Sequence, residues 1–137
     1  MSDYQLKQRW MTADSISKLT SLLGLPSHPH MQDWELECAD ARRLCEFLDL
    51  YERDNLNDDD RFALMKLIVA SLDECVGDSR ADKVMLQRIR RHLSASFSLH
   101  EVTIHYWCLW DWDKSDPDNV FAATPFMREI WKQHIHT

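Results

Sequence analysis

The sequence predicts an all-α fold, a single-domain bundle of five to seven helices that covers residues 1–137. Apolar residues recur at intervals of three and four along most of the chain, as they do on one face of a helix. The chain contains only 2 glycines and 4 prolines, too few for the turns of a β fold. Its hydrophobic fraction of 45% is enough to build a buried core.

The segment Leu99–Met127 is predicted to organise this bundle. Ser98 and Glu101 match the S-x-x-E capping box of a helix start, and apolar residues follow on two faces as far as Trp110. A helix that is apolar on two sides belongs in the middle of a bundle. We therefore expect Ser98–Trp110 to be a central helix rich in aromatic residues.

The same periodicity predicts three helices before residue 54. Their expected ranges are Asp3–Met11, a segment from a Thr12 or Asp14 cap to Gly24, and about Cys38–Arg53.

Asn57 marks the clearest helix start in the chain. Asparagine is a favoured N-cap, and the run Asp58, Asp59 and Asp60 would lie in the first turn, where the helix dipole favours negative charge. The run of aspartates therefore has a structural explanation that needs no metal. Gly77 is expected to end this helix.

Two further helices are expected on either side of the central one. The first is capped by Ser79 or Asp82, and the last begins at Thr124 as its cap with Pro125 at the first position. The inward-facing residues of the first are predicted to be Val84 or Met85, Leu86, Ile89 and Leu93.

The net charge of -7 is unevenly distributed. Residues Asp33–Asp60 contain eleven acids and three arginines, whereas Arg80–His92 contains five bases and one acid. An acidic surface repels nucleic acid and steers toward a basic partner, although solubility alone is the simpler explanation. We therefore expect a partner protein with a basic surface and no nucleic acid. The candidate contact residues are Glu35, Glu37, Asp40, Asp58, Asp59, Asp60, Asp111, Asp113, Asp116 and Asp118.

The acidic loop Asp111–Asn119 is a poor match to a calcium-binding loop. Asp111 and Asp113 match its first ligands, but Asp116 stands where glycine is needed and Ala122 where the closing glutamate belongs. We therefore predict no metal site and no cofactor.

No catalytic signature was found either. Two glycines cannot form a phosphate-binding loop, and the nucleophile-elbow and H-E-x-x-H patterns are absent. His105 and Cys108 could pair as imidazole and thiolate, but a buried core cysteine is more common. We predict that the protein is not an enzyme; a metal- or cysteine-dependent enzyme of unknown substrate and a structural subunit of a homo-oligomer are the alternatives.

The distribution of cysteines and apolar residues indicates the compartment. The 4 cysteines are scattered without a C-x-x-C pair, which predicts buried, reduced thiols. No stretch approaches the roughly 20 apolar residues of a membrane span, and the N-terminus has no signal-peptide core. We predict a cytoplasmic protein that does not bind a membrane.

Three patches of the sequence resemble a known group of proteins. They are DWELECAD with EFLDLYE (Asp33–Asp40 and Glu46–Glu52), Asn57–Met65, and HYWCLWD to DNVFAATPFMR (His105–Arg128). Together they resemble small all-helical bacterial proteins, including immunity-type proteins that neutralise secreted toxins. The resemblance implies a cytoplasmic binding protein with an acidic face for a toxin. The basic stripe Arg88–Arg91 departs from a uniformly acidic inhibitor and does not favour a nuclease-blocking mode.

Overall fold

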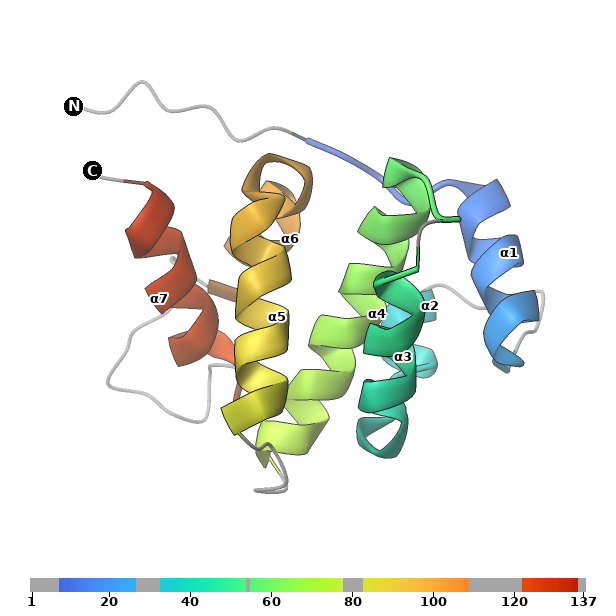
Figure 1. Cartoon of the computed structure of the whole chain (residues 1–137), viewed down its shortest axis with the longest axis horizontal. Helices are drawn as coiled ribbons and strands as arrows, with labels where there is room; N and C mark the ends of the chain where they lie inside the picture. Colours follow the sequence, from blue (N-terminus) through green and yellow to red (C-terminus); the bar gives the residue numbers. More distant parts are fainter. Residues whose placement is uncertain (1–7, 27–32, 54, 78–82, 109–121, 136–137) are drawn as a thin grey trace. The chain divides into compact units, whose positions relative to one another are not determined.

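The computed structural model describes residues 8–26, 33–53, 55–77, 83–108 and 122–135, and every regular element in these ranges is a helix (Figure 1). The elements are α1 (Ala13–Leu23), α2 (Trp34–Glu37), the 3-10 turn η1 (Ala41–Arg43), α3 (Leu44–Tyr51), α4 (Asp58–Gly77), α5 (Lys83–Ala95), α6 (Phe97–Cys108) and α7 (Thr124–His134). The predicted all-α class is confirmed.

The helices group into two compact units. One is Trp10–Ala81, and the other combines Asp82–Thr137 with Met1–Arg9. The expectation of a single domain over residues 1–137 stays a prediction. None of the helices in the described ranges is long and apolar enough to cross a membrane.

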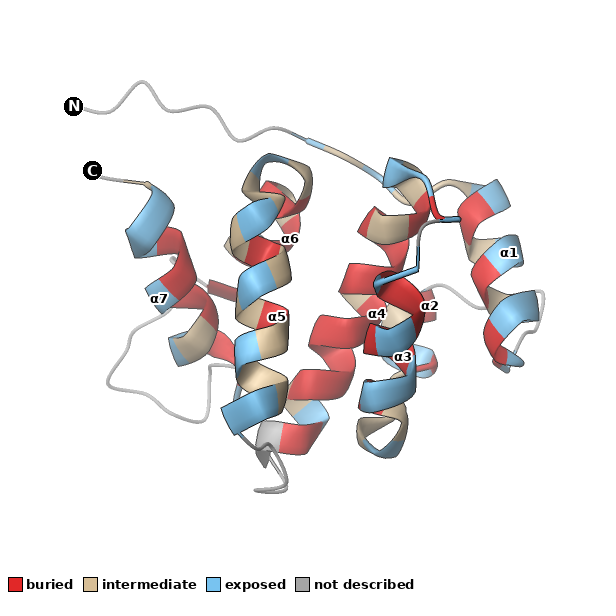
Figure 2. Cartoon of the chain, in the orientation of Figure 1, coloured by how far each residue is buried: buried red, intermediate tan, exposed pale blue. Residues whose placement is uncertain are grey.

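Helix α4 forms the core of the unit Trp10–Ala81, and α1, α2, η1 and α3 all pack against it. Figure 2 shows α4 buried along almost its whole length. Its fully buried apolar side chains are Phe62, Ala63, Leu64, Met65, Leu67, Ile68, Val69 and Leu72. They cover a wide arc of the helix, which is the pattern of a helix surrounded by others.

Local signals set both ends of α1. The Thr12 side chain accepts a hydrogen bond from the backbone N–H of Ser15 at 3.1 Å, so Thr12 is the N-cap. Gly24 ends the helix in the left-handed conformation, with φ of 60°, which glycine adopts without strain. The separate helix expected over Asp3–Met11 is not seen in its described part, because residues 8–12 are not helical.

The expected helix over about Cys38–Arg53 is wrong in its first half. The chain forms the short α2 first, leaves the helix at Cys38, and restarts through η1 into α3. Asp40 explains the break: its carboxylate accepts the backbone N–H of Arg42 at 3.0 Å, and its own N–H donates to the Ser71 hydroxyl at 3.0 Å. Asp40 is therefore an N-cap held by α4, not a position inside a helix.

Helices α5, α6 and α7 pack against one another in the second unit (Figure 1). The predicted capping box at Ser98 and Glu101 is wrong. α6 begins at Phe97, the Ser96 carbonyl accepts the first helical N–H bonds, and Glu101 is buried. A helix that follows another after one residue has no room for a separate cap at Ser98.

The predicted central, aromatic-rich helix is not supported. Tyr106 on α6 is 50% exposed and Trp107 is buried, while Trp110 and Trp112 lie outside the described residues. The longest run of buried residues belongs to α4 instead. Periodicity shows that a helix is apolar on two sides, but it does not show which helix the others surround.

The start of α7 also differs from the prediction. Ala123 occupies the N-cap, and Thr124 is already helical. The Thr124 hydroxyl donates to the carbonyl oxygen of Trp107 at 2.8 Å. The Thr124 side chain therefore caps the C-terminal end of α6, and it does not cap the N-terminus of its own helix.

Candidate functional site

The ten predicted acidic contact residues fall into four groups. Glu35 and Glu37 lie on α2, Asp40 precedes η1, and Asp58–Asp60 form the first turn of α4. The remaining four, Asp111, Asp113, Asp116 and Asp118, lie outside the described residues. All of the described candidates belong to the unit Trp10–Ala81.

Asp60 is buried and serves the fold. Its side chain is only 3% exposed, and it accepts hydrogen bonds from the Ser15 hydroxyl at 2.8 Å and the Lys18 ammonium at 2.7 Å. It also accepts the N–H of Asn57 at 3.2 Å, while the Asn57 side chain accepts the N–H of Asp60 at 2.8 Å. Burial raises the pKa of Asp60. These hydrogen bonds lower it by a larger amount together, so the net shift of the pKa is downward.

The exchange between Asn57 and Asp60 is a capping box, which confirms Asn57 as the N-cap of α4. Asp60 is therefore a buried structural residue and drops out as a surface contact, whereas Asp40 combines its capping role with a side chain that is 28% exposed. Asp58 is exposed and Asp59 is half-buried at the same helix start. Asp58 therefore presents its carboxylate at the surface of this helix start.

Glu35 and Glu37 create a negative region around α2. Glu37 is exposed, whereas Oε2 of Glu35 is buried without a hydrogen-bond partner among the described residues. Burial raises the pKa of the Cys38 thiol, and the charges of Glu37 and Glu35 raise it further. Burial lowers the pKa of Lys66 on α4, while Glu35 opposes that shift. The charge of Glu35 therefore acts on both neighbouring groups.

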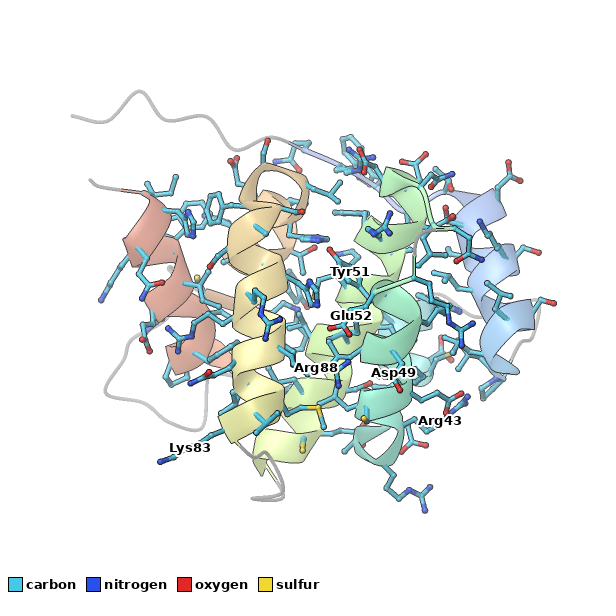
Figure 3. The ribbon with its side chains drawn as sticks, viewed as in Figure 1. Arg43, Asp49, Tyr51, Glu52, Lys83 and Arg88 are labelled. Carbon is cyan, nitrogen blue, oxygen red and sulfur yellow. The ribbon has the colours of Figure 1, made fainter. Side chains whose placement is uncertain are left out.

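The net negative charge of the protein is concentrated in one unit. Trp10–Ala81 contains fifteen acids and seven bases, a balance of -8, while the rest of the chain has a balance of +1. Three of those bases are already paired with acids: Lys18 with Asp60, Arg42 with Asp40, and Arg43 with Glu46. Figure 3 shows that α3 adds Asp49 and Glu52 to the acidic character of this unit. An excess of negative charge is left after the internal pairs form.

A second feature, which sequence reasoning missed as a site, is a groove between α5 and α7. Its volume is about 700 Å³, and its lining residues are Lys83, Leu86, Gln87, Arg90, Arg91, Ser94 and Glu129. Arg90 donates to Oε1 of Glu129 at 2.8 Å, and its guanidinium lies 5.3 Å from the centre of the Phe126 ring. The hydrogen bond and charge of Arg90 lower the pKa of Glu129. We name it the α5–α7 groove.

Spacing in the sequence could have revealed part of this groove. Lys83, Gln87, Arg91 and Ser94 recur at intervals of four and three, so they share one face of α5. Glu129 lies 39 positions after Arg90, and only the packing of α7 on α5 brings the two together.

The cysteine and the histidine of α6 lie in different surroundings. Cys108 is fully buried, and burial raises the pKa of its thiol to about 12. The ring of His105 packs against Trp131, with centroids 5.1 Å apart. A thiol with that pKa is protonated at neutral pH, so it is a poor nucleophile there.

All four cysteines are free thiols, as predicted, but Cys45 is exposed. Among the described residues, no group of three or more His, Cys, Asp or Glu side chains could hold a metal ion. The structure therefore offers acidic helix starts and a basic groove as its candidate sites.

Comparisons with family models, with curated proteins and with solved structures gave no match to this chain. The resemblance to immunity-type proteins therefore stays a prediction.

Proposed function

We propose that this chain is a protein-binding module that recognises a partner with a basic surface through the acidic unit Trp10–Ala81. The observation that carries the proposal is the surplus of carboxylates, a balance of -8, that the unit retains beside its own ion pairs. Complementary charge of this kind speeds association and selects against partners of the wrong sign.

The contact residues that best fit the proposal lie on α2 and at the start of α4. Glu37 and Asp58 are exposed, and Glu35 and Asp59 are half-buried beside them in the sequence. The fully buried side chains of α4 leave little apolar surface on that helix for a partner. Binding would therefore depend on charge, and salt would weaken it.

Within this class, we favour an inhibitor of the immunity type that occludes a toxin by steric and electrostatic means. Support comes from the resemblance of the patches Asp33–Asp40 and Asn57–Met65, both of which belong to the acidic unit. The second patch contains the capping box that orients the first turn of α4.

A pull-down from a bacterial lysate, followed by a binding measurement with the purified partner, tests the proposal. The variant Glu35→Gln, Glu37→Gln, Asp58→Asn removes three charges, and we expect at least about tenfold weaker binding at low salt. The matched control Asp14→Asn, Asp49→Asn, Glu74→Gln removes three exposed charges of the same unit. Equal binding by both variants and the unchanged chain would contradict the proposal.

A second variant, Asp111→Ala, Asp113→Ala, Asp116→Ala, tests the loop. Unchanged recovery of the partner would remove the loop residues from the contact surface.

Metal analysis of the purified protein tests the alternative of a metal-dependent enzyme. The mass of the protein in solution at two concentrations tests the alternative of a homo-oligomer subunit.

A further inference from the structure

The α5–α7 groove has the shape and charge of a binding site for an anionic chain. We propose that it binds an acidic segment of a partner protein, with carboxylates about 10 Å apart that meet Lys83 at one end and Arg90 and Arg91 at the other. This inference does not rest on the proposed function, which uses the other unit of the chain and charges of the opposite sign.

Two of the cations in the groove are available. Lys83 and Arg91 are exposed, and neither forms an ion pair or hydrogen bond with the residues that the structure describes. Figure 3 shows the Lys83 side chain extending away from α5, while Arg88 projects from another side of the helix. Lys83 can therefore reach a ligand without giving up an ion pair or side-chain hydrogen bond to the described residues.

Arg90, next to Arg91, is a preorganised donor. Its Nη1 is bonded to Glu129, and the Phe126 ring supports its guanidinium plane. A guanidinium has five N–H donors, and this bond to Glu129 uses one of them. Because the side chain is already held, a ligand would cost little side-chain entropy at this position.

The spacing along α5 fits an extended peptide. Lys83 and Arg90 are seven residues apart, which is roughly 10.5 Å along a helix at 1.5 Å per residue. A peptide in the extended polyproline II conformation advances about 3.1 Å per residue and presents the same face every third residue, so carboxylates three residues apart would reach both cations. Gln87 lies between them, Ser94 lies beyond Arg90, and Leu86 adds an apolar surface.

The carboxylate of Glu129 favours a peptide over a nucleic acid. It stands within the groove as an acceptor, so it can receive a backbone N–H of a peptide, a donor that a phosphate backbone lacks. The groove contains three cations, one of which is already bonded to Glu129, whereas nucleic-acid binding needs a broad basic footprint.

The probe for the test is a fluorescein-labelled peptide of about a dozen residues, with glutamate at every third position and leucine and serine between. A control peptide has glutamine in place of every glutamate. Fluorescence anisotropy with the full chain should show binding of the first peptide that weakens as salt rises, and much weaker binding of the second. No difference between the two peptides would overturn the proposal.

The charge-reversal variant Lys83→Glu, Arg91→Glu should bind the acidic peptide about tenfold more weakly. The matched control Arg42→Glu, Arg53→Glu changes two exposed arginines of the other unit by the same charge and should bind like the unchanged chain. Circular dichroism establishes that both variants are folded. Equal losses in the two variants, or tighter binding of a single-stranded oligonucleotide of the same charge, would overturn the assignment.

Discussion

Nε of Arg128 lies 2.6 Å from the carbonyl oxygen of Cys108, so a buried side chain of α7 closes the C-terminal end of α6. The last four carbonyls of a helix have no partner within it. The Thr124 hydroxyl satisfies the carbonyl of Trp107 in the same way. A cation at a helix C-terminus also interacts favourably with the helix dipole. These two bonds define the packing of α7 on α6.

Replacing Arg128 by methionine should therefore destabilise the unit that contains α6 and α7. Methionine keeps most of the buried volume but leaves the Cys108 carbonyl without its donor, which costs about 2 kcal/mol. Urea unfolding followed by circular dichroism measures the loss. Gln133→Met, an exposed change on the same helix, is the control and should shift the free energy of unfolding by less than about 0.5 kcal/mol.

Asp60→Asn should destabilise the unit Trp10–Ala81 by about 2 to 3 kcal/mol. The change removes the charge that binds Lys18 and Ser15 and weakens the capping box with Asn57. Asp58→Asn, an exposed neighbour in the same turn, should have an effect within about 0.5 kcal/mol. Similar losses in the two variants, measured by urea unfolding, would contradict the structural role of Asp60.

The contribution of Asp60 should also depend on pH. Its pKa is lowered in the folded chain, so its stabilising effect is present above the unfolded-state pKa of about 3.9 and is lost as pH falls through the lower folded value. The difference in stability between the unchanged chain and Asp60→Asn should therefore shrink in acid. A difference that stays constant down to pH of about 2 would show that charge is not its cause.

His100 should make the protein less stable in weak acid. The His100 side chain is fully buried. This burial lowers its pKa to about 3, with smaller contributions from the charges of His92 and Arg9. Because the unfolded chain binds a proton near pH 6.5 and the folded chain does not, stability falls as pH drops below that value. The loss at pH 5 is about 2 kcal/mol relative to pH 7.

Comparison of His100→Gln with the unchanged chain isolates this effect. Between pH 7 and pH 5 the free energy of unfolding of the variant, measured in urea, should fall by about 2 kcal/mol less than that of the unchanged chain. His134→Gln changes an exposed histidine and should keep the full dependence. The same pH dependence in the unchanged chain and His100→Gln would rule out His100 as the source.

Thiol labelling should separate Cys45 from the other cysteines. Cys45 is exposed, whereas Cys38, Cys75 and Cys108 are buried, so one thiol should react quickly with a chromogenic disulfide reagent. The other three should react only as the chain unfolds. Cys45→Ser should remove the fast phase, and a fast phase that survives this change would contradict the described burial.

The candidate sites could be predicted from the sequence only in part. The acidic character of Asp33–Asp60 was visible as composition, but composition could not separate the buried Asp60 from the exposed Asp58 two positions earlier. The face of α5 that carries Lys83 and Arg91 follows from helical spacing. Glu129, which completes the groove, comes from a distant helix and gives no local signal.

The sequence by itself determined the all-α class and two helix ends that depend on neighbouring residues, the cap at Asn57 and the end of α1 at Gly24, whereas it left Thr12 and Asp14 as alternative caps. The tertiary structure decided where α2 and α3 separate and how α6 ends. Those features depend on bonds between residues far apart in the chain, Asp40 with Ser71 and Cys108 with Arg128. Local propensity cannot report a partner 20 or 31 positions away, because only packing brings the two groups within hydrogen-bond distance.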